Sequence, residues 1–150
     1  MGLTPVYVIL AAKLALYEAL KTRFAGTGVQ VAYAEPADVR SRAVWFTDTV
    51  EPDIEPAAMS AGRRKPSNIT AELTVRAWAT VPGDPVRAET AVYELRADIE
   101  RAVFDGFDPR NVSGLMDARP VRVAVTNGEG GNGSTAVADV TLMLRARMYT

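Results

Sequence analysis

The alternation of apolar and polar positions is strongest between Asn68 and Thr80. Every second side chain is apolar there, which is the period of a strand with one buried and one exposed face. The apolar set is Ile69, Ala71, Leu73, Val75, Ala77 and Ala79. A turn at 81–83 follows, and Asp84-Pro85 is typical of a helix start, with an acid at the N-cap and proline in the first turn.

A helix is predicted from that start to about Phe104, because apolar residues recur there at helical spacing. The stripe consists of Val92, Leu95, Ile99 and Val103. We expect it to cover the apolar face of the preceding strand.

A second long helix is predicted from Thr4-Pro5 to about Phe24, where Gly26 and Gly28 end it. Its expected apolar stripe is Val6, Leu10, Leu14, Tyr17, Leu20 and Phe24. Ile9 and Leu16 widen the apolar arc beyond what one sheet face requires. Either the helix is deeply packed, or part of it meets a neighbouring subunit.

Shorter alternating runs predict four more strands: residues 29–33, 43–47, 121–126 and 135–149. The first two are expected to be neighbours. The last two are expected to form a hairpin around the glycine-rich loop 127–134.

Residues 48–67 show no period and contain three prolines, which predicts a long loop. Its first half is acidic, and its second half contains the basic run Arg63, Arg64 and Lys65. Loops of this length inside compact domains are often functional or disordered. The loop is therefore either a solvated segment or an arm that becomes ordered against a partner.

Together these elements predict one α+β domain over residues 1–150. It has a mainly antiparallel sheet of about five strands, with two main helices packed on one face. The other face is left open, and an open face with a tryptophan among charges is a candidate interface. Its predicted residues are Trp45, Trp78, Glu72, Arg76, Arg145 and Arg147. The alternative for one tryptophan is a cover by the 48–67 loop.

The amino-acid composition excludes several kinds of catalytic and metal-binding site. The chain has no cysteine and no histidine, and its net charge is −1. Disulfides, thiolate metal sites, cysteine nucleophiles and histidine bases are thereby excluded. The sequence predicts no catalytic residue, no metal site and no cofactor.

The glycines of residues 128–133 match the dinucleotide-binding pattern G-x-G-x-x-G. That fingerprint requires a helix after the glycines, and a strand is predicted there instead. We therefore interpret this segment as a hairpin tip.

Residues 1–12 carry no charged side chain, but Lys13 follows and no basic segment precedes them. This pattern differs from that of a signal peptide, and the apolar run is too short to span a bilayer. We expect a soluble protein, made in a cytoplasm, with no membrane partner.

The order of these segments resembles the tail terminator proteins of long-tailed bacteriophages, the lambda-like tail terminators. The resemblance covers nearly the whole chain. It rests on the helix 5–24 with its following strand, the polar insertion 48–67, the strand–helix unit 68–104 and the closing hairpin 121–149.

The resemblance implies a structural virion protein and no enzyme. Its copies would form a homo-hexameric ring at the neck, capping the tail tube and ending its polymerisation. The partners it implies are further copies of the chain, the tail tube protein and the head–tail connector, with DNA only passing through the lumen. Arg63, Arg64 and Lys65 are candidates for a tube, connector or lumen contact, or else a solubilising loop tip.

Three alternatives remain open. The first is another neck or minor tail protein of phage. The second is a small ligand-binding or enzymatic α+β domain, which would need a pocket with convergent polar groups. The third is a nucleic-acid binder that stacks bases on Trp45 and Trp78 of the open sheet, which the near-neutral charge disfavours.

Overall fold

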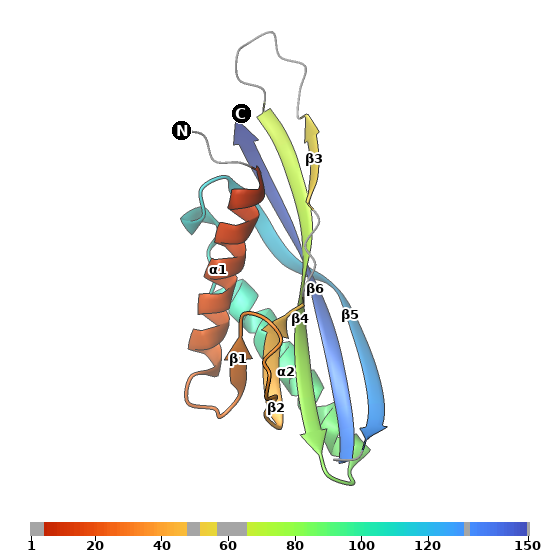
Figure 1. The fold of residues 1–150 in the computed structure, drawn as a ribbon. Coiled ribbons are helices and arrows are strands. Elements are labelled where there is room, and N and C mark those ends of the chain that lie inside the picture. The colour runs from red at the N-terminus through yellow and green to blue at the C-terminus, as the bar shows by residue number, and fades with distance from the viewer. Residues whose placement is uncertain (1–4, 48–51, 57–65, 131–132, 150) are drawn as a thin grey trace.

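The computed structural model describes residues 5–47, 52–56, 66–130 and 133–149. Two helices, α1 (Pro5–Phe24) and α2 (Pro85–Asp105), lie on one side of a six-stranded sheet in this part of the chain (Figure 1). The strands are β1 (Gln30–Ala32), β2 (Arg42–Phe46), β3 (Asp53–Pro56), β4 (Pro66–Val81), β5 (Leu115–Gly130) and β6 (Gly133–Tyr149), and a short 3-10 helix, η1 (Pro109–Asn111), precedes β5.

The sheet is built around β4 and β6, which pair along their whole length (Figure 1). The strand order is β1-β2-β4-β6-β5, and β3 pairs with the first part of β4 on the side that β2 occupies farther along. All pairs are antiparallel except β1 with β2. The predicted α+β class, with a mainly antiparallel sheet and helices on one face, is confirmed.

The strand–helix unit at the centre also agrees with the prediction. The apolar residues of β4 are buried, and so is the stripe of α2 that packs against β4 and β6. The carboxylate of Asp84 caps α2 by accepting a hydrogen bond of 3.0 Å from the Arg87 amide. The local sequence signals and the packing in the folded structure therefore agree on the bounds and the buried faces of β4 and α2.

Two of the predicted loops contain strands. Residues 53–56, inside the expected 48–67 loop, form β3, and β4 begins at Pro66. Most of the expected 127–134 loop belongs to β5 and β6, which pair out to Gly130 and Gly133. The sheet thus has six strands rather than about five, because pairing with a neighbouring strand overrides the weak strand preference of proline and glycine.

The buried side of α1 matches the predicted stripe only in part. Leu20 and Phe24 are buried as predicted, whereas Leu10 and Leu14 are 44% and 47% exposed. Val8, Ala12 and Leu16 are buried instead. The side chain of Val6 lies outside the described residues. Because α1 is apolar nearly all round, its periodicity does not determine which side faces the core.

Contacts of its charged residues also fix α1. Lys13 places its Nζ 4.3 Å from the ring centre of Tyr33, and Arg23 donates to Asp98 of α2 at 2.7 Å. These contacts join α1 to the end of β1 and to α2. Neither described helix combines the length and apolar character needed to cross a membrane.

Candidate interface on the open face of the sheet

The face of the sheet turned away from the helices, which we call the open face, is formed by alternate residues of β4, β5 and β6. The strand register places side chains of opposite charge next to each other across its centre. Its polar and charged members are Asn68, Thr70, Glu72, Thr74, Arg76, Thr80, Asp117, Arg119, Arg122, Thr126, Thr135, Asp139, Thr141, Arg145 and Arg147.

Arg76 of β4 and Asp139 of β6 are direct cross-strand partners. The guanidinium donates two hydrogen bonds to the carboxylate, from Nε to Oδ1 at 2.8 Å and from Nη2 to Oδ2 at 3.0 Å. Glu72 accepts a hydrogen bond of 3.1 Å from Arg122 of β5. Bidentate pairing of this kind fixes the orientation of both side chains. The centre of the open face is therefore a charged but internally paired surface.

The two tryptophans lie together at the β2 side of this face. Trp78 is half-buried, and its ring centre is 6.1 Å from that of Trp45. Trp45 is only 2% exposed, although its pairing with Arg76 places it on the open face. The expectation that the open face displays Trp45 is therefore wrong.

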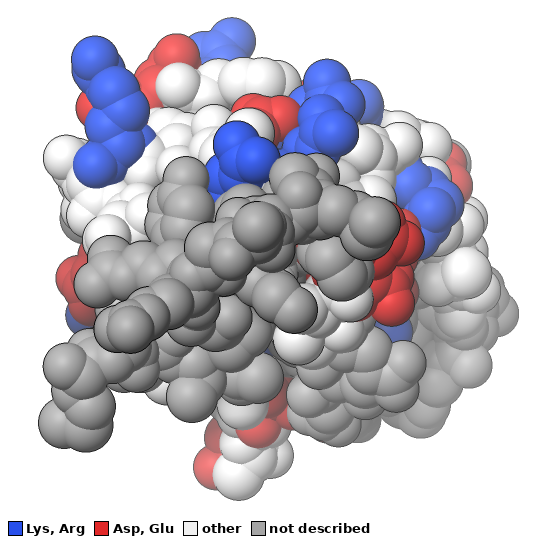
Figure 2. All heavy atoms as spheres, turned by 90° about the horizontal axis from the view of Figure 1, so that it is seen from above, with Lys and Arg blue, Asp and Glu red and all other residues white. Residues whose placement is uncertain are grey.

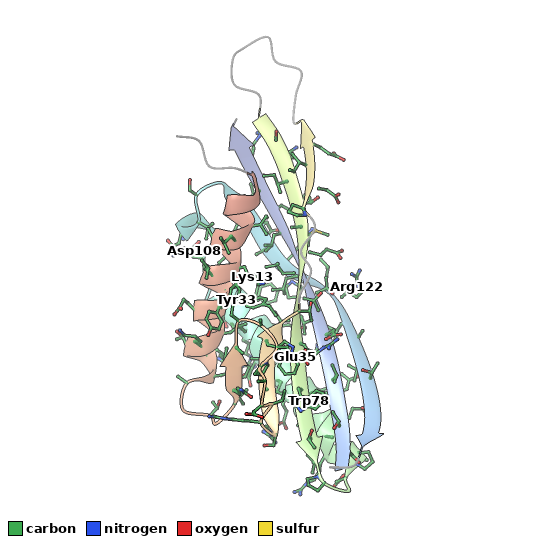
Figure 3. The ribbon with its side chains drawn as sticks, viewed as in Figure 1. Lys13, Tyr33, Glu35, Trp78, Asp108 and Arg122 are labelled. Carbon is green, nitrogen blue, oxygen red and sulfur yellow. The ribbon has the colours of Figure 1, made fainter. Side chains whose placement is uncertain are left out.

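A short crossover accounts for much of this arrangement. Because β1 and β2 are parallel, residues 33–41 must pass across the sheet to connect them. Gln30 holds this segment on the open-face side, donating to the Asp38 carbonyl at 3.1 Å and accepting from the Arg40 amide at 2.9 Å. Figure 3 shows Glu35 of the segment in the same region of the view as Trp78. This end of the open face is thus occupied by the chain itself.

At the opposite end of the open face, several charged side chains have no ion-pair partner among the described residues. Arg145 and Arg147 are exposed and form no ion pair with another described residue. On β3, two strands away, Asp53 and Glu55 are exposed and share this face, since they pair with Thr70 and Asn68. This end therefore presents charges that remain available to a partner.

The predicted site residues are only partly brought together. Glu72, Arg76, Trp78, Arg145 and Arg147 share the open face, whereas Arg63, Arg64 and Lys65 lie outside the described residues. The partners Asp139 and Arg122 were not among the predicted site residues. Their opposite charges are visible in the sequence, but the pairing depends on a register that the turn residues did not specify.

Seen from one end, the described surface carries acidic and basic side chains beside each other rather than one large patch of a single sign (Figure 2). This distribution agrees with the net charge of −1. It gives no support to an extended electrostatic track for a nucleic-acid backbone.

Small depressions occur elsewhere. One of about 420 Å³ is lined by Arg42, Arg87 and Glu94, and another of about 410 Å³ lies around Asp105 and Asp108. Within the described part of the chain, no three acidic residues gather as a possible metal site.

Asp108 has a structural partner in the second depression. Its carboxylate accepts hydrogen bonds from the side chain and the amide of Arg110, and it caps η1. The Arg110 side-chain hydrogen bond, followed by the amide bond, lowers the pKa of Asp108 below its ordinary value. Asp108 is therefore explained as the residue that caps η1.

The fold is similar to that of a known virion protein. A chain of the solved structure described as "Virion of native gene transfer agent (GTA) particle" matches with a TM-score of 0.54 and 16% sequence identity. The match covers 94% of this chain and 98% of that chain. At this identity the likeness shows a shared fold over the whole length. No protein-family model and no curated protein matches the sequence.

Proposed function

We propose that this protein is a structural component of a phage-like virion. The observation that supports this most directly is the end-to-end similarity of fold to a chain of a gene transfer agent virion. The open face supports the same proposal, because it combines an internally paired centre with unpaired charges at one end. Such a surface is suited to binding another protein.

Within the virion, the role we propose is that of a tail terminator. Copies of the chain join through a heterologous interface, which closes into a ring when the rotation between neighbours divides the circle. One side of the ring binds the end of the tail tube and stops its growth. The other side binds the head connector at the neck, and DNA passes through the lumen.

The mechanism is geometric and involves no chemical step. A ring ends polymerisation when it is complementary to the last tube ring on one side and not on the other. The three long paired strands β4, β6 and β5 give each copy a stiff body. The charges that remain exposed on these strands then select the partner.

Electron microscopy of the purified protein, alone and mixed with tail tubes, tests this proposal. We expect rings about as wide as a tail, and tubes that carry one ring at one end and stop growing. Binding to portal complexes but not to tubes would instead assign the protein to another part of the neck. A protein that stays monomeric and leaves tube growth unchanged would contradict the proposal.

A further inference from the structure

Among the described residues, the sheet has two unpaired edges at the end that carries β3. There the strand order is β3-β4-β6-β5, so β3 forms one edge and the first part of β5 forms the other. Within the described residues, no backbone hydrogen bond joins another segment to Asp53–Pro56 or to Met116–Pro120 from outside the sheet. Unpaired edges of this kind are templates for adding a strand.

The directions of the strands make these edges compatible with each other. Each of the three pairs from β3 to β5 is antiparallel, so β3 and β5 run in opposite directions. Two copies placed side by side in the same orientation bring β5 of one against β3 of the next as an antiparallel pair. The sheet then continues from copy to copy without a change in pattern.

The two edges also carry charged side chains on the open face. β3 presents Asp53 and Glu55, and β5 presents Arg119, whose side chain is 57% exposed, together with Asp117, whose carboxylate lies 3.5 Å from Arg119 Nε. Each edge also exposes one large apolar residue, Ile54 at 50% and Met116 at 62%. Met116 lies at a β-bulge, which is a common means of directing a side chain out of the regular ladder.

We propose that copies of this chain join edge to edge, with β3 of one copy pairing with residues 117–119 of β5 in the next. In the register that matches the two faces, Asp53 lies opposite Arg119, Ile54 opposite Ala118 and the like-charged Glu55 opposite Asp117. The attractive charge pair of this contact is therefore Asp53 with Arg119. The prolines at positions 56 and 120 confine the pairing to this short window, since proline supplies no backbone donor. The occupant of each edge is thus a second copy of the same chain.

This contact rests on the ring proposed above and specifies how the ring is held together. Because the two edges of one copy differ, the contact is heterologous and leads to a ring or an open filament rather than to an isolated dimer. The open faces of successive copies then form one continuous surface.

A cysteine pair tests the contact directly, because the natural chain has no cysteine. In the double variant Asp53→Cys and Arg119→Cys, the two positions of one chain are separated by β4 and β6. At about 4.8 Å between strands they lie roughly 14 Å apart, too far for a disulfide within one copy. Mild oxidation is therefore expected to produce a ladder of linked oligomers on non-reducing gels.

Three control variants accompany this experiment. Each single cysteine variant is expected to give no species larger than a dimer. The double variant Arg87→Cys and Arg101→Cys, at two exposed positions of α2, is expected to give no ordered ladder. A ladder of equal extent in the α2 variant would overturn the inference.

Charge reversal provides a second measurement on the protein without cysteine. Arg119→Glu, and separately Asp53→Lys, are expected to raise the concentration needed for assembly by at least about tenfold, because each places like charges opposite each other at positions 53 and 119. An equimolar mixture of the two reversed proteins is expected to recover assembly, because in an alternating order every contact joins either two natural edges or two reversed edges. The variant that combines Asp53→Lys with Arg119→Glu is expected to regain assembly as well.

The outcomes separate this inference from the proposed function. Rings that form equally well in every variant would overturn the edge contact and leave the tail terminator role intact. Linked filaments in place of rings would support the edge contact and overturn the ring. A protein that does not associate at any concentration, with or without tubes, would overturn both.

Discussion

At the scale of single residues, Gly133 lies where the neighbouring backbone leaves little room for a side chain. Its φ is +116°, and a Cβ atom at this position would lie 2.7 Å from the Cα of Pro82 in the turn between β4 and α2. We predict that Gly133→Ala lowers the free energy of unfolding by about 1–3 kcal/mol, because it adds backbone strain and a steric clash. Urea unfolding followed by circular dichroism measures this loss.

Gly128 is the matched control for Gly133, since both belong to the glycine-rich end of the β5–β6 hairpin. No atom lies within 4 Å of a Cβ built at Gly128, and its backbone is not in the left-handed region. Gly128→Ala is expected to change stability by less than about 0.5 kcal/mol. Equal losses in the two variants would contradict the close approach of Gly133 to Pro82.

The ion pair of Asp108 with Arg110 predicts a pH dependence. The Arg110 side chain lowers the pKa of Asp108 in the folded state, so the pair stabilises the fold above the ordinary aspartate pKa. That contribution is lost as the pH falls through the lowered value. In Arg110→Ala, the titration midpoint of the Asp108 carboxyl carbon in NMR spectra should rise toward its ordinary value. An unchanged midpoint would show that Arg110 is not the cause.

At the scale of elements, α1 has two apolar sides that differ in burial. Leu16 is 1% exposed and Leu14 is 47% exposed. We predict that Leu16→Ala costs about 2–5 kcal/mol of stability, as expected for a fully buried leucine. Leu14→Ala should cost less than about 1 kcal/mol in the monomer. Comparable losses in urea unfolding of the two variants would contradict this assignment of the buried side.

The same comparison tests whether α1 meets a neighbouring subunit, which the sequence left as an alternative. If it does, Leu14→Ala weakens assembly while leaving the stability of the monomer nearly unchanged. Leu16→Ala should instead reduce stability in both states. Assembly is measured by analytical ultracentrifugation.

The elements that could be predicted are those whose residues repeat with one clear period. β4 alternates strictly and α2 carries a narrow apolar stripe, so both were placed nearly to their ends. The buried side of α1 could be predicted only in part, because apolar residues occur nearly all round this helix. β3 was missed because an acidic, proline-containing segment has weak strand preference and gains its structure only from pairing with β4.

The candidate interface was predictable only in outline, for a related reason. Alternation shows that Glu72, Arg76 and Trp78 share a face, but not which residues of other strands lie opposite them. That information depends on register, which the long β4–β6 ladder sets over many residues. The sequence therefore did not predict that Arg76 pairs with Asp139. For the same reason it did not predict the contact between Trp45 and Trp78.

At the scale of the whole molecule, the open face divides into a part that holds the fold and a part free to bind. Arg76 is held by Asp139, whereas Arg145 and Arg147 have no ion pair among the described residues. We predict that the double variant Arg145→Gln and Arg147→Gln keeps its free energy of unfolding within about 1 kcal/mol. Its assembly into rings, or its binding to tail tubes, should weaken, because those cations then no longer meet acidic groups of a partner.

A variant on the helical side of the sheet provides the control for this last prediction. Arg87→Gln with Arg101→Gln removes the same charge from two exposed positions of α2. It should leave both stability and assembly nearly unchanged, which separates a specific contact from an effect of net charge. Ring formation and tube binding would be measured at several salt concentrations, and the natural protein should be the more sensitive to salt. Equal weakening by the two double variants would contradict a role for the open face.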